Sequence, residues 1–115
     1  MDTRAYTRNM KPEDDDGDVV LDRDPKTAKA RRYAVVFYND PYTTKWFVVL
    51  VLEQFFRMNE TLATHFMLTV HHKGKGVAAV YSRDIAETKA GQIMDFAREN
   101  GMPLLVTAEP EDESG

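Results

Sequence analysis

The stretch over residues 35–43 constrains the fold of this chain more than any other. It reads Val-Val-Phe-Tyr-Asn-Asp-Pro-Tyr-Thr, an apolar run that stops at polar and turn-forming residues. β-branched and aromatic residues favour a strand, and Asn, Asp and Pro together favour a tight turn. An amphipathic helical pattern begins directly afterwards. The stretch therefore predicts a strand, an exposed corner and a helix start, with Asn39, Asp40 and Thr43 where polar groups can reach a ligand.

The pattern between residues 31 and 109 predicts one small α+β domain in the order βααβαβ. A three-stranded antiparallel sheet packed against three helices fits this order. The expected elements are a strand over 32–38, helices over 44–56 and about 60–73, a strand over 77–81, a helix over 83–100 and a strand over 104–108. Side-chain type and position predict Thr43, Asn59 and Ser82 as N-caps and Gly74 as the left-handed end of the second helix.

Helical spacing also predicts which residues of the later helices face the core. In the second helix these are Leu62, Phe66 and Val70, with Ala63 and Met67 beside them. In the third helix they are Ile85, Ile93, Phe96 and Ala97.

Both ends of the chain differ from this domain. Residues 1–30 contain the run Glu-Asp-Asp-Asp at 13–16 and few apolar residues, and residues 110–115 are again acidic. Such segments bury too little apolar surface to offset the entropy of ordering them. We expect a disordered acidic N-terminal arm and a frayed acidic tail. Composition alone favours an inert, solubilising role for the arm.

Composition excludes several classes of function. The 115 residues include no cysteine, so disulfides, thiolate nucleophiles and Cys-type zinc sites are excluded, and a reducing cytoplasm is favoured. A net charge of −4 argues against general nucleic-acid binding. The N-terminus lacks the apolar segment of a signal peptide, and the longest apolar run, over 46–52, is too short to span a bilayer. We expect a cytoplasmic protein without membrane contact.

No arrangement of polar residues predicts catalysis or a cofactor. His65 and His72 lie on roughly one helix face, but zinc needs three or four converging ligands, so exposed histidines are the interpretation. Ser82 suits a helix cap and lacks the context of a nucleophile. We therefore predict no metal, no cofactor and no enzymatic activity.

The end of the second helix combines an apolar floor with one imidazole. Met67 and Val70 precede His71 there. His71 can line a pocket with Met67, one turn back, or it can simply assist the last helical turn. Spacing alone slightly favours the helix-end role. Together with the corner at 39–43, the cluster suggests a small binding pocket with polar groups at its mouth.

Five blocks of the sequence, spread over residues 32–109, resemble the ClpS adaptors of bacterial protein degradation. The blocks are Asn39-Asp40-x-Tyr42-Thr43, Phe47-Val48, Met67-Leu68-x-Val70-His71 with Gly74-Lys75, Ala86-Glu87-Thr88-Lys89 and Pro103-Leu104.

The resemblance implies both a fold and a function. ClpS-like domains are α+β. They bind the free N-terminal residue of proteins that begin with Phe, Leu, Tyr or Trp, a signal called an N-degron. They deliver these substrates to an AAA+ unfoldase, ClpA or a ClpC-type homologue, which feeds the protease ClpP. The N-terminal arm of the family takes part in delivery, which makes residues 1–30 an expected working part.

The resemblance also implies roles for particular residues. The N-degron amine is expected to bind Asn39, Asp40 and neutral His71, whose acceptors suit an ammonium group. The expected side-chain pocket comprises Thr43, Lys45, Val48, Met67, Val70 and Leu104. Asp84 and Lys89 match family positions that contact the unfoldase.

Two residues depart from the family pattern. Pro41 stands where the family usually has a second aspartate, and Lys45 stands where it often has a methionine gate. They leave open the alternative of a ClpS-like paralogue with altered or lost N-degron binding that only modulates the unfoldase. A ribosome-associated module and a small hydrolase are more distant alternatives.

Overall fold

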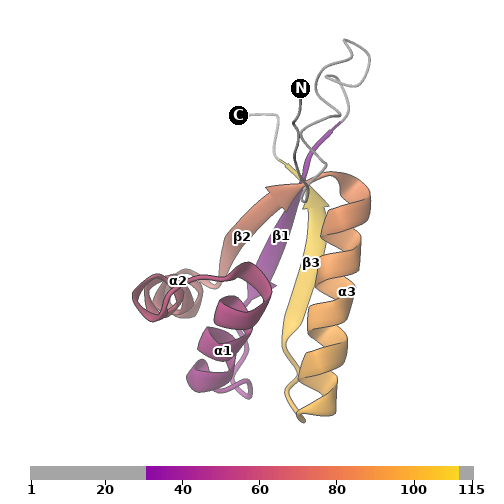
Figure 1. The fold of residues 1–115 in the computed structure, drawn as a ribbon. Coiled ribbons are helices and arrows are strands. Elements are labelled where there is room, and N and C mark those ends of the chain that lie inside the picture. Colours follow the sequence, from indigo (N-terminus) through magenta and orange to yellow (C-terminus); the bar gives the residue numbers. More distant parts are fainter. Residues whose placement is uncertain (1–30, 112–115) are drawn as a thin grey trace, which may run out of the picture. The chain divides into compact units, whose positions relative to one another are not determined.

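The computed structural model describes residues 31–111, and its centre is a three-stranded antiparallel sheet in the order β2-β1-β3 (Figure 1). The predicted arm over 1–30 and the tail over 112–115 lie outside the described residues. The order βααβαβ and the α+β class are confirmed. The elements are β1 (Tyr33–Tyr38), α1 (Lys45–Phe56), α2 (Glu60–Lys73), β2 (Lys75–Tyr81), α3 (Arg83–Glu99) and β3 (Leu105–Pro110).

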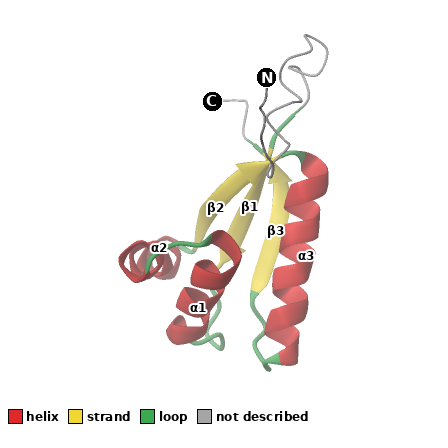
Figure 2. Ribbon diagram, in the orientation of Figure 1, coloured by secondary structure: helices red, strands yellow, loops and turns green. Residues whose placement is uncertain are grey.

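The hydrophobic core lies between the sheet and the helices. Val35 and Phe37 of β1 are fully buried in it. Figure 2 shows α1 between α2 and α3, in front of the sheet. No helix within residues 31–111 is long and apolar enough to cross a membrane.

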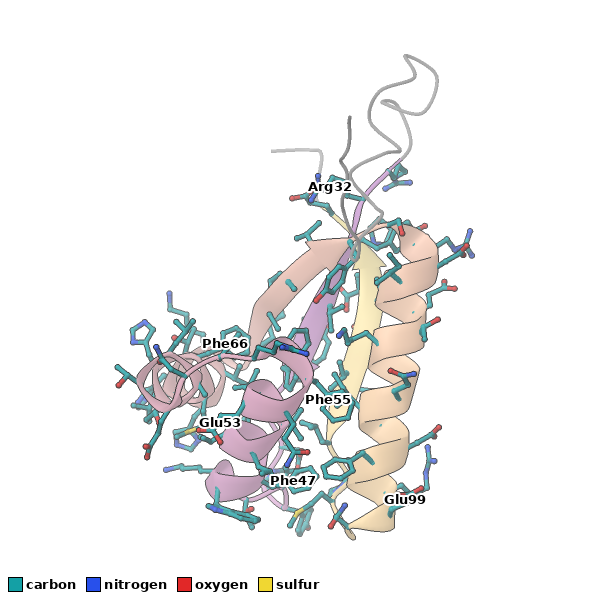
Figure 3. The ribbon with its side chains drawn as sticks, in the orientation of Figure 1. Arg32, Phe47, Glu53, Phe55, Phe66 and Glu99 are labelled. Atoms are coloured by element: carbon teal, nitrogen blue, oxygen red, sulfur yellow. The ribbon has the colours of Figure 1, made fainter. Side chains whose placement is uncertain are left out.

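Aromatic side chains fix the position of α1 in this core (Figure 3). The rings of Phe47 and Phe96 stack with centroids 5.5 Å apart, and Phe55 meets Phe96 edge-on at 5.7 Å. Phe37 meets Phe56 of α1 and Phe66 of α2 edge-on, at 5.9 and 5.8 Å. Offset and edge-to-face pairs are the favoured aromatic geometries. They join α1 to α3 through Phe47 and Phe55, and to β1 through Phe56.

The N-cap of α1 differs from the prediction. The cap is Thr44, whose side-chain oxygen accepts a hydrogen bond from the Phe47 amide at 3.1 Å. Thr43 stands one residue before the N-cap position of a helix that begins at Lys45, and its hydroxyl donates to Asp40. Asn59 caps α2 as predicted, and Gly74 ends it with φ of +93°. Ser82 stands at the N-cap position of α3, but its side chain makes no capping hydrogen bond.

The buried faces of α2 and α3 are rotated from the predicted ones. Leu62 is 51% exposed and Ile85 is 37% exposed, so neither is a core residue. The face of α2 that meets the core is centred on Ala63, Met67 and Val70. On α3 the buried residues are Ala86, Ala90, Ile93 and Ala97. Ala63, Ile93 and Ala97 were predicted, whereas Ala86 and Ala90 were missed because a small side chain carries a weak periodic signal.

Candidate functional site

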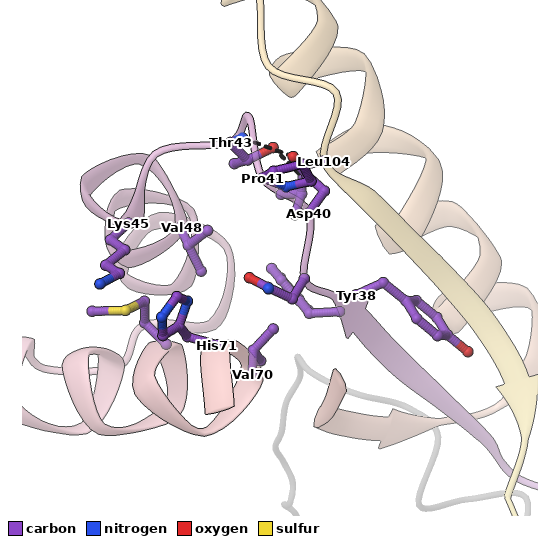
Figure 4. A pocket seen from close by; sticks show the side chains of 12 residues that line it. Tyr38, Asp40, Pro41, Thr43, Lys45, Val48, Val70, His71 and Leu104 are labelled. Carbon is purple, nitrogen blue, oxygen red and sulfur yellow. Dashed lines mark hydrogen bonds between the residues drawn. The ribbon is translucent and has the colours of Figure 1, made fainter. Parts of the chain in front are cut away.

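A cavity of about 420 Å³ opens where β1, the corner after it, α1 and α2 meet (Figure 4). All nine residues predicted for the N-degron amine and side chain line it: Asn39, Asp40, Thr43, Lys45, Val48, Met67, Val70, His71 and Leu104. They come from four separate segments of the chain. The fold thus brings together the 39–43 corner and the end of α2, which the sequence pattern already suggested as a pocket, with Lys45, Val48 and Leu104, which only the resemblance added.

The corner at residues 40–43 is held by the Asp40 carboxylate. Its Oδ1 accepts hydrogen bonds from the backbone amides of Tyr42 at 2.8 Å and Thr43 at 2.7 Å. Its Oδ2 accepts from the Thr43 hydroxyl at 2.7 Å. An aspartate that accepts from amides two and three residues on fixes the turn by its own side chain. Asp40 therefore shapes the cavity rim as well as lining it.

These contacts change the acidity of Asp40. Partial burial raises the pKa of its carboxyl group, but the hydrogen bonds from the Thr43 hydroxyl and from the Thr43 and Tyr42 amides more than offset it, so the net pKa is lowered. The rim therefore carries a negative charge at neutral pH. A carboxylate has about four lone-pair sites, so one that accepts three hydrogen bonds retains acceptor capacity for a ligand.

Asn39 and His71 are brought to the same mouth by a backbone contact. The Asn39 amide donates to the Gly74 carbonyl at 2.9 Å, which ties the end of β1 to the end of α2. Both side chains are exposed. Neither the Asn39 carboxamide nor the His71 imidazole has a hydrogen-bond partner among residues 31–111. Both are therefore available to a ligand.

The floor of the cavity is apolar. Val48, Met67, Val70 and Leu104 are all buried and line it. Lys45 is exposed at the start of α1, and Figure 4 shows it on the α1 side of the mouth, facing His71 of α2. An apolar slot with a few polar groups at its mouth is the usual form of a small-ligand site.

Three lining residues were not predicted as site residues: Phe37, Tyr38 and Pro41. The Tyr38 hydroxyl donates to Glu109 of β3, and the Thr107 hydroxyl donates to the same carboxylate at 2.6 Å. The bond to Glu109 raises the pKa of Tyr38, and the bonds from Thr107 and Tyr38 lower the pKa of Glu109. This contact was missed because the last strand was expected to end at residue 108.

Asp84 and Lys89, the residues predicted to contact the unfoldase, do not line this cavity. Together with Ile85, Thr88 and Gln92 they border a separate shallow depression of about 300 Å³ on α3. The Lys89 Nζ donates to the Phe55 carbonyl at 3.0 Å and lies over the rings of Phe56 and Tyr81. Lys89 therefore also satisfies a carbonyl in the last turn of α1.

Metal ligands do not cluster in the described part of the chain. No group of three or more His, Cys, Asp or Glu side chains within residues 31–111 is arranged to hold an ion. The hydrogen-bond acceptors and the apolar floor of the cavity suit a cationic ligand with an apolar side chain.

The sequence and the fold match those of known proteins. Residues 28–107 match the family model described as ATP-dependent Clp protease adaptor protein ClpS. The ATP-dependent Clp protease adapter protein ClpS of Deinococcus radiodurans is 54% identical over 88 residues, covering 76% of this chain and 78% of that protein. Its counterpart in Variovorax paradoxus is 49% identical over 103 residues, covering 88% and 87%.

A solved structure agrees with these sequence matches. Agrobacterium tumefaciens ClpS2 bound to L-phenylalaninamide aligns with a TM-score of 0.70 and 44% identity, covering 72% of this chain and all of that one. Because the family model spans most of the chain and the relatives match over most of both lengths, the chain belongs to the ClpS family of Clp protease adaptors.

Proposed function

We propose that this protein binds the free N-terminal Phe, Leu, Tyr or Trp of N-degron substrates and delivers them to an AAA+ Clp unfoldase for degradation by ClpP. The observation that carries the proposal is the convergence of Asn39, Asp40 and His71 on the mouth of one apolar cavity. A relative with the same fold binds L-phenylalaninamide, which has a free α-amine and an aromatic side chain.

The cavity suits recognition of an N-terminal residue. An α-ammonium group has three N–H donors and one positive charge. The Asn39 carbonyl oxygen, the Asp40 carboxylate and an unprotonated nitrogen of His71 supply acceptors for it. The slot between Val48, Met67 and Val70 takes the side chain. A blocked amine has fewer donors and no charge, so acceptors at the mouth lose their partners.

Delivery requires a second surface. We assign it to Asp84 and Lys89 on α3, which lie outside the cavity and leave it open while the partner is bound. Residues 1–30 are expected to assist at the unfoldase. The relatives are named adaptors of the Clp protease, which supports a binding role for this chain without catalysis of its own.

Fluorescence anisotropy with a labelled Phe-peptide tests the proposal. A competitor with a free N-terminal Phe should bind at least ~2 kcal/mol more tightly than the same peptide with an acetylated amine, the scale of leaving buried polar groups unpaired. His71→Ala should remove most of the affinity for the free peptide, whereas His65→Ala, on the same helix but outside the cavity, should not. Equal affinity for the free and acetylated peptides would refute the proposal.

Lys45 favours a second candidate function. Its positive charge lines a cavity that is proposed to hold a cation. A paralogue that modulates the unfoldase without binding N-degrons would bind neither peptide in the same assay, yet would still alter degradation by the Clp protease.

A further inference from the structure

Lys45 is a cation without a partner at the cavity mouth. It is exposed at the start of α1 and lines the cavity. Its ammonium group makes no ion pair, hydrogen bond or cation–π contact with any residue in the range 31–111. By contrast, Arg83 pairs with Glu87 on α3 at 3.0 Å. The Lys45 ammonium is therefore available to an anionic group of a ligand.

The local structure around Lys45 does not offset its charge. The first turn of α1, in which Lys45 lies, contains no acidic residue. The N-terminus of a helix carries a partial positive charge of its own, which favours anions and disfavours cations. The start of α1 and the Lys45 ammonium together make this side of the mouth electropositive.

A bound N-degron leaves this positive charge unbalanced. Among the described residues that line the cavity, Asp40 is the one carboxylate and Lys45 the one lysine or arginine. The α-ammonium group of a substrate is proposed to pair with Asp40, so the Lys45 ammonium then stands near a second positive charge. A carboxylate on the substrate itself, close to its N-terminus, removes this imbalance because opposite charges attract at short range.

We propose that Lys45 is a specificity-determining residue, which favours N-degron substrates that have Asp or Glu at the second position. The inference rests on the N-degron function proposed above. Consecutive Cα atoms are only about 3.8 Å apart, so the second residue lies at the mouth when the first fills the slot. Figure 4 shows Lys45 on the α1 side of that mouth, facing His71, which is expected to hold the amine.

The second side chain suits this contact better than the first. Successive side chains of an extended peptide point to opposite sides, so the second points out of the slot when the first points into it. A lysine keeps its ammonium in water while its aliphatic stem lies along apolar surface. The flexible stem lets the Lys45 ammonium meet a carboxylate at the rim and leaves the apolar slot to the first side chain.

Competition binding with peptides that differ only at the second residue tests the proposal. At low ionic strength Phe-Glu should bind about two- to fivefold more tightly than Phe-Gln, the range of an exposed ion pair. Phe-Lys should bind more weakly than Phe-Gln, because its charge repels Lys45 and the bound amine. Both differences should shrink at about 1 M salt, where exposed charges are screened within a few ångströms.

Variants of Lys45 separate its charge from its shape. Lys45→Gln should abolish the preference for Phe-Glu over Phe-Gln, and Lys45→Arg should retain it. Lys45→Glu should reverse the order, so that Phe-Lys binds most tightly. Lys73→Gln is the matched control and should retain the parent preference. Lys73 is exposed on α2 and does not line the cavity, and it lies two residues after His71, a spacing at which helix side chains do not share a face.

Two outcomes would overturn the inference: equal binding of Phe-Glu and Phe-Gln to the parent protein, or a preference for Phe-Glu that survives Lys45→Gln. In either case, weaker binding of acetylated than of free Phe-Gln would show that the main pocket stands. Equal binding of free and acetylated Phe-Gln would overturn the proposed function as well.

Discussion

At the scale of single residues, Asp40 holds the corner together, in addition to the amine-binding role that the resemblance implies. The resemblance implies that the Asp40 carboxylate binds the N-degron amine. The same carboxylate accepts hydrogen bonds from the Tyr42 and Thr43 amides and from the Thr43 hydroxyl. The Asp40 carboxylate thus places a negative charge at the cavity and also fixes the turn over residues 40–43. Pro41, where the family usually has a second aspartate, lines the same cavity, so Asp40 is the carboxylate that this corner contributes to the lining.

The lowered pKa of Asp40 predicts how its contribution to stability depends on pH. A carboxyl group whose pKa is lower in the folded protein stabilises the fold above its ordinary value of 3.8 and loses that contribution as pH falls through the folded value. Asp40→Asn should therefore be less stable than the parent at about pH 7, and the difference should shrink by about pH 3.

Urea unfolding at the two pH values measures this difference. Asp95→Asn is a suitable control, because Asp95 accepts an exposed hydrogen bond from Arg98 and such pairs contribute little. A difference between Asp40→Asn and the parent that stays constant from neutral to acidic pH would show that the corner does not depend on the ionised carboxylate.

At the scale of elements, the α2–β2 junction depends on a glycine conformation that α3 does not need. Gly74 ends α2 with φ of +93°, and its carbonyl accepts a hydrogen bond from the Asn39 amide. Gly91 lies within α3, at a helical φ. An added Cβ would meet nothing within 4 Å at either position. Backbone conformation alone therefore distinguishes the two glycines.

Alanine substitutions at these glycines should have opposite effects. Gly74→Ala should lower the free energy of unfolding by ~1–2 kcal/mol, because a left-handed conformation is unfavourable for a residue with a Cβ. Gly91→Ala should raise it by ~0.5–1 kcal/mol, because alanine favours the interior of a helix. Chemical denaturation measures both. Changes of the same sign would contradict this account of the junction.

The sequence predicted the elements more reliably than their exact faces and ends. The predictions for the two ends of α2 were correct. An N-cap depends on side-chain type, which identified Asn59, and a left-handed helix end favours glycine, which identified Gly74. Thr43 and Thr44 are identical neighbours, so side-chain type could not show which of them stands at the N-cap of a helix that begins at Lys45. Leu62 and Ile85 were expected in the core because large apolar side chains dominate a periodic pattern, although both are exposed.

At the scale of the whole molecule, contacts distant in sequence determine what the site contains. The bond from Tyr38 to Glu109 spans 71 positions, and the bond from Lys89 to Phe55 spans 34. Neither has a local sequence signal. Nine of the twelve cavity residues were assigned to the site through the resemblance to the family, because spacing alone could not distinguish a pocket role for His71 from a helix-end role. Their convergence on one cavity is a property of the fold.

The separation of the cavity from the α3 depression predicts that peptide binding and delivery respond to different substitutions. Asp84 is exposed in the first turn of α3 and lines the α3 depression but not the cavity, whereas His71 lines the cavity but not the depression. Asp84→Lys should therefore leave the affinity for a Phe-peptide unchanged and slow the degradation of an N-degron reporter by the Clp unfoldase and protease. His71→Ala should impair both, because a substrate that is not bound is not delivered.

Asp84 is a better position for this test than Lys89, because Lys89 also has a structural contact with α1. Removing the Lys89 amine would also leave the Phe55 carbonyl of α1 without its donor, so a loss of delivery could reflect a change in α1. Asp95→Lys makes the same charge change at another exposed position of α3 and should affect neither assay. If Asp84→Lys weakens peptide binding as much as His71→Ala does, the two sites are coupled through the fold. If it leaves degradation unchanged, the unfoldase binds elsewhere.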